Sequence, residues 1–551
     1  MDFLQAPPIL SNTFHDDPTL RAYCARALPT ALFAAIEPDL AELGAYAAAS
    51  WSKARLETPK TPNLISWSAW GERIDHIETT PTWQRGAELT ARYGFVAAGH
   101  EPQFGALARV DQFLRVYLYH VPSQFHSCPL AMSDGAATAL KAAGNRALCE
   151  RALPHLLARD PAHLWLSGQW MTELAGGSDV GNTDTIAQRG EHGQWRLHGR
   201  KWFTSAVVGD MALALARPQG AAPGADALAL FYLESRKADG AWNGIRIDRL
   251  KDKLGTRELP TAEVHLDGAQ AIAVGELANG VRQITPVLNI SRTWNAVGAI
   301  ATMRHCLTLA LDYANRREAF GRTLASLPLH RATLAHLIAE FEAAFQLVFC
   351  VIELLGREEH EQHEHADDAL MLRVLTPLAK LWTGKLAVRI ASETCEAFGG
   401  AGYIEDTGIP QLLRDAQVFP IWEGTTNVLA LDVLRALGRD SLDVFSQRLL
   451  NWCDSGTGDT QLQSALATAQ SWFAAHAGKR PALESGARGF AMTLARCAAA
   501  AVLARHAHWA ASAQHDTRAH AALSLFIEHG LVRLDTIPMD AVAALVDNGR
   551  S

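Results

Sequence analysis

The stretch MTELAGGSDVGNTDTIA, Met171–Ala187, lies where the pattern of the sequence changes from helical to β. Thr172 and Ser178 supply hydroxyl groups, and Gly177 with the glycine before it lets backbone N–H groups approach a ligand closely. Such a loop suits an anionic or dipolar cofactor. Taken alone, the same residues more often form a simple turn that Asp179 caps.

The segment GRKWFTSA, Gly199–Ala206, follows on the β side of this boundary. Trp202 offers a flat apolar wall and Thr204 a hydroxyl donor, and both features would flank and orient a flavin ring. The alternative is that Trp202 is a core residue on a strand. Because the segment follows the Gly-Gly-Ser loop so closely, the pair favours a cofactor site.

The segment RDAQVFPIWEGTTNVLALDVLRAL, Arg414–Leu437, places a carboxylate just before a helix. Glu423 lies between Trp422 and a glycine, and the helix start is marked by Thr425 and the two residues after it. One interpretation is a first-turn glutamate that the helix dipole favours. The other is a general base, because an apolar pocket raises the pKa of a carboxyl toward working pH.

Outward from these segments, the chain divides into four predicted domains. Apolar residues recur at three- and four-residue spacing in Ala136–Arg159, which indicates helices. Short alternating runs such as ALALFYLE, separated by Gly, Pro and Asp, indicate antiparallel strands. The predicted fold is therefore α+β, with an N-terminal helical domain (1–165), a central antiparallel β domain (166–278), a C-terminal helical bundle (279–438) and an appended Ala-rich helical domain (439–551).

The run EEHEQHEHADD at 358–368 is a charged break within the predicted bundle. We expect a solvated loop between two helices. Its histidines alternate with acids in a segment with little to fix their geometry, so a metal site is the less favoured interpretation.

Length and composition bound the class of protein. The 551 residues suggest three or four packing units at about 150 residues each. Hydrophobic residues make up 48% and charged residues 20%, so the chain is expected to fold around a large core. The net charge of −8 leaves no global positive field for nucleic acid or an anionic membrane.

The cysteines and the apolar stretches indicate in which cellular compartment the protein is expected. Eight cysteines without a CxxC pair fit reduced thiols rather than disulfides or a cysteine zinc site. The N-terminus MDFLQAPPILSNTFHDD has no basic region before an apolar stretch, so no signal or transit peptide is expected. Apolar stretches such as Ala343–Leu355 are shorter than the ~18 to 20 residues that cross a bilayer. We therefore expect a cytoplasmic protein without a membrane segment.

Four motifs follow one another along the chain. They are Thr172-Glu173…Gly177-Ser178-Asp179 with Lys201-Trp202-Phe203-Thr204, Tyr313-Ala314…Arg317…Phe320-Gly321, Phe398-Gly399-Gly400-Ala401-Gly402-Tyr403, and Arg414-Asp415-Ala416…Glu423-Gly424-Thr425. In this order they resemble the motifs of the acyl-CoA dehydrogenases, and four motifs in family order are far more specific than any one of them. The resemblance covers about residues 100 to 438 and agrees with the helical, β, helical layout.

Further markers extend over nearly the whole chain and are individually weaker than these four motifs. They are Pro7-Pro8…Ser11-Asn12, the run from Asp248 to Gly255, Pro328, Glu396, Ile421-Trp422-Glu423-Gly424 and the appended C-terminal domain. In these markers the chain resembles the AidB-like branch of the family, the flavoproteins of the adaptive response to alkylation.

The resemblance implies an FAD enzyme that oxidises an acyl-CoA or similar thioester at Cα–Cβ. In the family a base takes the α proton while hydride leaves the β carbon for flavin N5, and the implied base is Glu423. The other base position of the family lies just before Arg292 and holds Ser291, which cannot act as a base. By the same matching, the flavin or its ribityl chain contacts Met171, Thr172, Gly177, Ser178, Trp202 and Thr204, with Thr425 and Asn427 nearby.

The resemblance also implies an oligomer with shared cofactor sites. A dimer of dimers is the family default, so a homotetramer is expected, and an electron-transfer flavoprotein is one candidate electron acceptor. The residues matched to those that reach the adenine half of FAD in a neighbouring subunit are Arg317, Phe320, Glu396, Gly399 and Gly400.

Two side chains are candidate substrate contacts by this resemblance, Ser178 and Arg292. Arg292 matches a family arginine beside substrate and base, and the equally weighted alternative is that it braces the fold by pairing with a carboxylate. Asn289 stands where the family often has an Asp that contacts the pantetheine arm. This departure bears on whether acyl-CoA binds in the standard way.

Two other functions remain open. AidB-like proteins are thought to bind duplex DNA through their C-terminal domain, and that function needs a positive face. Residues 441–551 carry nine basic and nine acidic side chains, and Arg488, Arg496 and Arg505 fall on different faces of a helix. DNA binding is therefore expected to be weak. A flavin oxidase that passes electrons to O₂ shares the fold, and the sequence does not separate it from a dehydrogenase.

Overall fold

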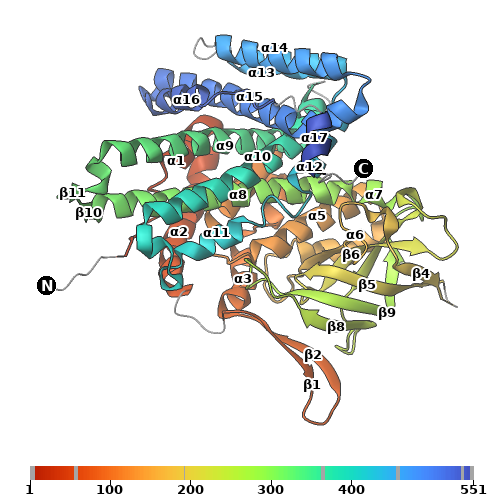
Figure 1. Ribbon diagram of the computed structural model, residues 1–551. Coiled ribbons are helices and arrows are strands. Elements are labelled where there is room, and N and C mark those ends of the chain that lie inside the picture. Colours follow the sequence, from red (N-terminus) through yellow and green to blue (C-terminus); the bar gives the residue numbers. More distant parts are fainter. Residues whose placement is uncertain are drawn as a thin grey trace. The chain divides into compact units, whose positions relative to one another are not determined.

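The computed structural model describes residues 7–54, 60–190, 193–360, 367–453, 459–534 and 539–546. Figure 1 shows the helices and strands along the chain. They group into two compact units, and the boundaries of the four predicted domains remain predictions. Unit 1 comprises Met1–Ala41, Phe104–Val110 and Asn295–Ser551, and unit 2 comprises Glu42–Gln103 and Asp111–Trp294.

Unit 2 contains a seven-stranded sheet in the order β3-β6-β4-β5-β9-β7, with β8 paired to β9. Its pairings are antiparallel, as predicted for this region, except that β6 runs parallel to both β3 and β4. The buried positions of β5 include Leu197, Lys201 and Thr204. The strands are β3 (Ser167–Trp170), β4 (Ile186–Arg189), β5 (Trp195–Ser205), β6 (Met211–Pro218), β7 (Ala229–Glu234), β8 (Ile245–Leu250) and β9 (Thr261–Ala273).

Helices cover one face of this sheet, since Leu140 of α5 and Leu148 of α6 share a core with Leu230 of β7. The next residue of β7, Phe231, belongs to a second core, because side chains alternate across a strand. The sheet is therefore buried on both faces. Unit 2 holds α3 (Pro81–Tyr93), α5 (Ser127–Ala143), α6 (Arg146–Leu156) and α7 (Gly280–Gln283), while α2 (Thr30–Ala54), α4 (Ala108–Tyr119) and α8 (Thr285–Arg316) have residues in both units.

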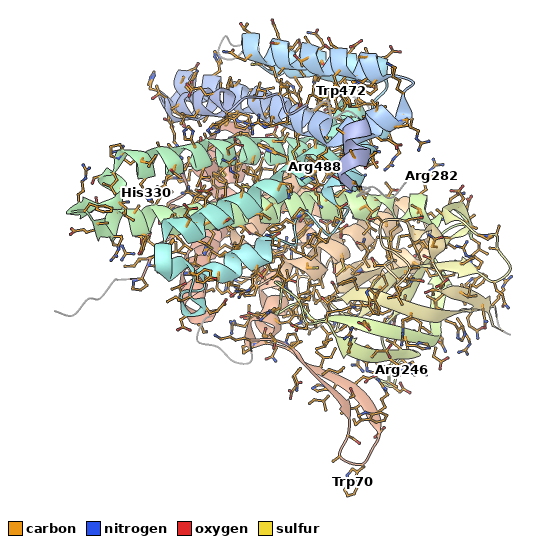
Figure 2. All side chains as sticks on the ribbon, in the orientation of Figure 1. Trp70, Arg246, Arg282, His330, Trp472 and Arg488 are labelled. Atoms are coloured by element: carbon orange, nitrogen blue, oxygen red, sulfur yellow. The ribbon has the colours of Figure 1, made fainter. Side chains whose placement is uncertain are left out.

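A hairpin in unit 2 departs from the prediction that the N-terminal region is helical throughout. β1 (Asn63–Trp67) and β2 (Arg73–Glu78) pair in antiparallel fashion. In β2, Asp75 and Ile77 are buried whereas His76 and Glu78 are exposed, and this two-residue period favours a strand over a helix. Trp70 at the tip of the hairpin is 96% exposed (Figure 2).

Unit 1 is built mainly of helices, in agreement with the predicted bundle and appended helical region. Phe345 and Phe349 of α9 pack against Tyr23 of α1, and the ring centroids of Tyr23 and Phe349 lie 4.5 Å apart. The helices are α1 (Pro18–Ala27), α9 (Pro328–His360), α10 (Asp368–Ala397), α11 (Ile409–Ala416), α12 (Thr426–Ala436), α13 (Arg439–Cys453), α14 (Asp459–His476), α15 (Arg480–Gln514), α16 (Arg518–Glu528) and α17 (Met539–Val546). The two-residue strands β10 (Glu318–Ala319) and β11 (Arg322–Thr323) form a short hairpin after α8.

Among the described residues, α15 alone is long and apolar enough to cross a membrane by length and composition. Of its most apolar stretch, 83% is buried inside the protein. Burial of that extent is what the core helix of a helical unit shows, so the helix gives little support to a membrane segment.

The charged break at 358–368 is described only in part. Residues 358–360 end α9 and 361–366 lie outside the described residues. Asp368 at the start of α10 is buried and accepts hydrogen bonds from Arg357 at 2.8 Å and Arg448 at 3.2 Å. Within the part of the chain that the structure describes, no group of three or more His, Cys, Asp or Glu is placed to hold a metal ion.

Candidate functional site

The predicted ligand loop follows β3 and is joined to β5 through the backbone. The Trp202 N–H donates to the Thr172 carbonyl oxygen at 3.0 Å, so the two segments that the sequence pairs are in contact. Glu173 and Gly176 exchange two backbone hydrogen bonds of 3.1 Å, which closes a tight turn. A Cβ atom at Gly177 would lie 2.9 Å from Thr172 Oγ1, and this crowding favours glycine at that position.

The side of the loop predicted to meet a ligand is open. Gly177 and Ser178 are exposed, and Met171 and Thr172 are half-buried. Asp179 accepts a hydrogen bond from the Gly181 N–H at 3.1 Å, which makes it the cap that the simple turn requires. A capped turn and a ligand loop are therefore compatible here.

Beneath the loop, a buried ion pair ties it to β5. Lys201 Nζ donates to Glu173 Oε1 at 2.5 Å and to the Leu215 carbonyl oxygen at 2.8 Å, and both charged side chains are buried. The carboxylate also accepts from Thr185 Oγ1 at 2.5 Å and from the Asp184 N–H at 2.7 Å. Burial lowers the pKa of Lys201, and the neighbouring carboxylate opposes that shift. Each charge thus depends on the other to be tolerated in the interior.

The predicted flavin wall on β5 carries a buried hydroxyl without a partner. Thr204 is fully buried, and its Oγ1 makes no hydrogen bond to any described residue. A buried hydroxyl without a hydrogen bond is unfavourable in free energy, so a ligand with polar ring atoms would stabilise the site by bonding to it. Trp202 is half-buried, and Lys251 Nζ lies 3.4 Å from its ring centroid, a cation–π contact that holds the indole in place. These residues fit a planar cofactor with hydrogen-bonding atoms.

In unit 1, Glu423 lies in a turn that two helices hold. Its φ of 57° is in the left-handed region that residues other than glycine rarely adopt. Lys380 Nζ of α10 donates to the carbonyl oxygen of the next residue at 2.6 Å. Asn295 of α8 accepts from Trp422 Nε1 at 2.7 Å and donates to the Phe419 carbonyl oxygen at 3.1 Å. Strained backbone persists where surrounding contacts enforce it, and such positions cluster at functional sites.

The helix that follows this turn begins without a side-chain cap. Thr425 is the N-cap residue of α12, and within the described chain its side chain makes no capping hydrogen bond. Thr425 and Asn427 are both exposed. The first N–H groups of α12, and the positive end of its dipole, are therefore open to an external acceptor.

The two motifs predicted to reach a neighbouring subunit's cofactor lie together in unit 1. The rings of Tyr313 and Phe398 stack with centroids 4.3 Å apart, so the hairpin after α8 lies beside the turn after α10. Arg317 leads into this hairpin, and Phe320 at its tip has a φ of 54° and is 95% exposed. The other predicted residues, Glu396, Gly399 and Gly400, are exposed at the turn.

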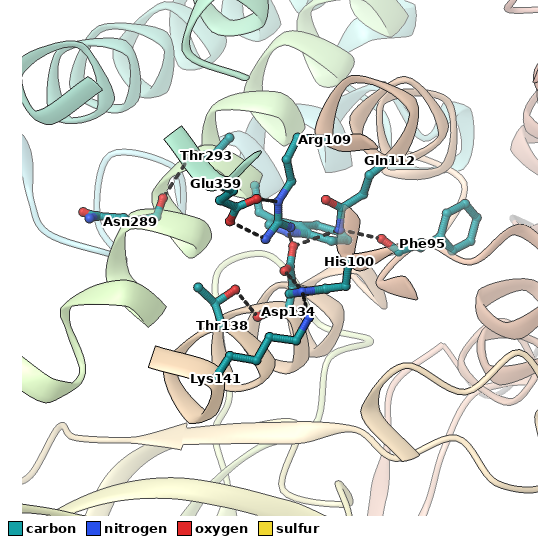
Figure 3. A network of polar contacts seen from close by, with 11 residues as sticks. Phe95, His100, Arg109, Gln112, Asp134, Thr138, Lys141, Asn289, Thr293 and Glu359 are labelled. Atoms are coloured by element: carbon teal, nitrogen blue, oxygen red, sulfur yellow. Dashed lines mark hydrogen bonds and ion pairs between the residues drawn. The ribbon is translucent and has the colours of Figure 1, made fainter. Parts of the chain in front are cut away.

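The predicted substrate contact Arg292 is half-buried on the part of α8 that belongs to unit 2. Its neighbour Ser291 donates its hydroxyl to the Leu288 carbonyl oxygen at 3.2 Å, so that hydroxyl is bound within the helix. Thr293 likewise donates to the Asn289 carbonyl oxygen at 3.0 Å (Figure 3).

A buried carboxylate anchors this part of α8 within unit 2. Asp134 of α5 is fully buried and accepts a hydrogen bond from Trp294 Nε1 at 2.8 Å. It also contacts Gln112 Nε2 and His100 Nε2, each at 2.8 Å (Figure 3). Because Trp294 lies two residues after Arg292, this network restrains the segment that carries the predicted substrate contact.

The structure brings predicted residues together in three places: the loop with β5, the turn before α12, and the hairpin with the turn after α10. Glu173 and Lys201 lie within the family motifs but have no predicted role, and Asn295 and Lys380 are not among the predicted site residues. For two of these residues the sequence contains a feature from which a buried role could have been predicted. Lys201 occupies a buried register position of β5, and Lys380 stands alone in the apolar run LTPLAKLW of α10.

Comparison with protein families matches three segments of the chain. Residues 5–161 match the N-terminal domain of the adaptive response protein AidB, residues 168–269 the acyl-CoA dehydrogenase middle domain, and residues 278–438 the acyl-CoA dehydrogenase C-terminal domain.

Similar proteins extend this match over most of the chain. Acyl-CoA dehydrogenase family member 11 of Caenorhabditis elegans is 40% identical over 532 residues, which cover 92% of this chain and 86% of that protein. AidB of Escherichia coli K12 is 33% identical over 399 residues, or 70% of this chain and 71% of that protein. The crystal structure of C. elegans ACDH-11 in complex with C11-CoA matches with a TM-score of 0.93 at 37% identity, covering 100% of this chain and 97% of the other.

Proposed function

The chain belongs to the acyl-CoA dehydrogenase family, and on that premise we propose that it oxidises the Cα–Cβ bond of an acyl-CoA, with Glu423 as the base that removes the α proton. The family consists of flavoprotein oxidoreductases that act on the CH–CH group of acyl-CoA, and their cofactor, FAD, is the cofactor of this chain. When bound, FAD supplies an acceptor at N5 for the hydride that leaves the β carbon.

The turn that carries Glu423 is the observation that supports this role. A carboxylate that abstracts a weakly acidic α proton must be held at a fixed position and shielded from water. Lys380 and Asn295 fix the backbone on either side of it, and the indole of Trp422 is immobilised by its hydrogen bond to Asn295. Thus the chain keeps Glu423 in a left-handed backbone conformation that glycine would adopt with less strain.

Unit 2 supplies the groups proposed to hold the cofactor and substrate. Thr204 and Trp202 on β5 offer the unsatisfied hydroxyl and the flat wall, and the loop offers Thr172 and Ser178. The proposal that the substrate is an acyl-CoA draws on the similarity to ACDH-11, whose structure contains C11-CoA. Ser178 and Arg292 are the proposed substrate contacts.

We further propose a cytoplasmic homotetramer in which Arg317, Phe320, Glu396, Gly399 and Gly400 contact the partner subunit's FAD, with an electron-transfer flavoprotein as electron acceptor. The exposure of Phe320 at 95% and Tyr403 at 90% supports an oligomer, because large apolar side chains this exposed favour burial against another chain.

A second candidate function is a role in the response to alkylation damage with DNA binding and little dehydrogenase activity. It is favoured by the AidB N-terminal domain match and by the 33% identity to E. coli AidB. The two candidates differ in one measurable property, the reduction of bound flavin by an acyl-CoA.

The test is anaerobic reduction of the bound flavin by a panel of acyl-CoAs, followed by its visible absorbance. Wild type should bleach with at least one chain length. Glu423→Gln should retain FAD and lose ~10² to 10⁴ in the reduction rate, because it keeps the shape of the side chain without its basicity. Glu528→Gln, an exposed glutamate on α16, is the matched control. Bleaching at equal rates in Glu423→Gln and wild type would remove Glu423 from the mechanism, and no bleaching of wild type would favour the second candidate.

A further inference from the structure

Unit 1 contains a cavity of about 410 Å³ lined by α9, α10, α15 and the segment after α16. Five of its lining side chains are cationic, Lys385, Arg389, Arg488, Arg496 and Arg533, and one is a carboxylate, Glu340. Arg488 lies on α15 (Figure 2). A lining this rich in one charge is unusual for a chain whose net charge is −8.

Two of the six charges neutralise each other. Arg496 donates to Glu340 through Nη1 at 3.0 and 2.8 Å, and both side chains are buried. His529 Nδ1 also contacts this carboxylate at 3.1 Å, and Arg496 Nε donates to the Gly530 carbonyl oxygen at 2.8 Å. This pair forms the buried wall of the cavity and offers no net charge to a ligand.

Three of the remaining cations are not neutralised in that way. Lys385, Arg389 and Arg488 are exposed, and none of them forms an ion pair with a described residue. Lys385 and Arg389 stand four residues apart on α10, a spacing at which like charges repel each other. Arg533 donates through Nη1 and Nη2 to the carbonyl oxygens of Val532 and His529. A bound anion would reduce the repulsion between Lys385 and Arg389.

An apolar surface lies beside these cations. Trp382, Leu386 and Met492 line the same cavity, and Trp382 is held edge-on against Phe526 with ring centroids 5.8 Å apart. Gly489 of α15 makes the close packing possible, because a Cβ atom there would lie 2.5 Å from the Arg533 carbonyl oxygen. Cationic and apolar surfaces thus share one preformed space.

We propose that this cavity binds a small phosphorylated molecule of nucleotide size, with its phosphates on Lys385, Arg389 and Arg488 and its apolar part beside Trp382. The volume lies in the range of about 300 to 1,000 Å³ typical of small-molecule sites. Phosphate groups suit these cations, because each arginine can pair with phosphate oxygens through two parallel hydrogen bonds and the lysine adds a further positive charge. A duplex would contact a wide, even stripe of cations, whereas these converge on a cavity with a carboxylate in its wall.

The test uses full-length protein loaded with FAD and titrated with two probes, ATP without divalent cations and a 20-base-pair duplex DNA, by isothermal titration calorimetry. ATP should bind, and Arg389→Gln should weaken that binding roughly tenfold or more, since a charge-assisted hydrogen bond is lost. Arg488→Gln should act in the same direction. Arg331→Gln, which removes the same charge from an exposed position on α9 outside the cavity, should leave the affinity unchanged.

The variants must also keep their FAD and their rate of flavin reduction by an accepted acyl-CoA, since the proposed site is separate from the catalytic one. Loss of FAD from Arg389→Gln would assign the cavity to the cofactor instead and overturn the proposal. Absence of ATP binding to wild type would overturn it, as would equal weakening in Arg331→Gln. Binding of the duplex alone, lost in Arg389→Gln, would reassign these cations to DNA.

Discussion

In unit 2 the predicted ligand loop is held from below by a buried ion pair, whereas in unit 1 the turn that carries Glu423 is held by neutral hydrogen-bonding groups and one lysine acting on its backbone. Glu173 and Lys201 compensate each other's charge, so the loop depends on both. The Glu423 turn instead carries strain in its own backbone and relies on Asn295 and Lys380 to hold it. Substitutions in the ion pair under the loop should therefore lower the free energy of unfolding. Substitutions of Glu423 should instead lower the rate of flavin reduction.

The largest effect on stability is expected when the buried pair is broken. Lys201→Met leaves the Glu173 carboxylate buried without its cation, so the free energy of unfolding should fall by ~3 to 5 kcal/mol. Urea unfolding of the FAD-free protein measures this directly. The double variant Glu173→Gln/Lys201→Met should recover part of the loss, and Lys237→Met, an exposed lysine of the same unit, should lose almost nothing. A loss below ~1 kcal/mol in Lys201→Met would contradict the role given to the pair.

Acid should destabilise unit 2 through two buried histidines. Burial lowers the pKa of His120 to about 3 and that of His126 to about 3. In the unfolded chain a histidine has a pKa of about 6.5, so between these values the unfolded state binds more protons and stability falls as the pH falls. Each histidine should lower the free energy of unfolding by about 2 kcal/mol between pH 7 and pH 5.

Urea unfolding at both pH values is the measurement for this acid effect. His120→Asn, which can keep a hydrogen bond to Ser127, should show a smaller difference between the two pH values than wild type. Replacing the exposed His163 in the same way should leave the pH dependence unchanged. Equal pH dependence in all three proteins would show that His120 is protonated as readily in the folded state as in the unfolded one.

Strain at Glu423 should be visible as a difference between two substitutions. Both Glu423→Ala and Glu423→Gly remove the carboxylate and should lose flavin reduction. Glycine accepts a φ of 57° without a steric cost, so Glu423→Gly should be more stable than Glu423→Ala by about 1 kcal/mol. Thermal unfolding of the two variants side by side gives the difference. If Ala is as stable as Gly, the turn stores no strain.

The smallest effect on the folding of a single chain is expected at Phe320. With 95% of the side chain exposed, Phe320→Ser should change the free energy of unfolding of an isolated subunit by less than about 0.5 kcal/mol. If the homotetramer buries this residue, the same variant should dissociate in light scattering and lose FAD more readily. Trp70→Ser changes a side chain that is 96% exposed but is not among the residues proposed to contact the partner subunit's FAD, so this matched control should do neither. An intact oligomer in Phe320→Ser would contradict the proposed subunit contact.

Much of this architecture was accessible from the sequence. The long helices and the strands have periods of 3.6 and 2 that the apolar residues reveal, and the motifs of the ligand loop and β5 lie close along the chain. The hairpin β1–β2 was not predicted because the sequence NLISW of β1 does not alternate between apolar and polar residues, although Gly71 in its turn has a positive φ of 81°.

What could not be predicted depends on contacts between distant residues. Nothing near Trp422 in the sequence indicates that Asn295 bonds to it, and the anchor at Lys380 is likewise supplied by a different helix. The cationic cavity shows the same limit. The count over 441–551 came out neutral, yet Arg488 of α15 shares its cavity with Lys385 and Arg389 of α10, which that count left out.

Two glycines of the turn Phe398–Tyr403 should differ in which substitutions they tolerate. At Gly402 a Cβ atom would lie 2.0 Å from the Cys395 carbonyl oxygen, so every other residue should be rejected by any screen for folded protein. At Gly400 a Cβ atom would meet nothing within 4 Å, and its φ is not positive. In a library scored once for abundance and once for growth that needs the enzyme, Gly402 should be intolerant in both. Gly400 should be free in the first, and it should be constrained in the second if, as proposed, it contacts the partner subunit's FAD.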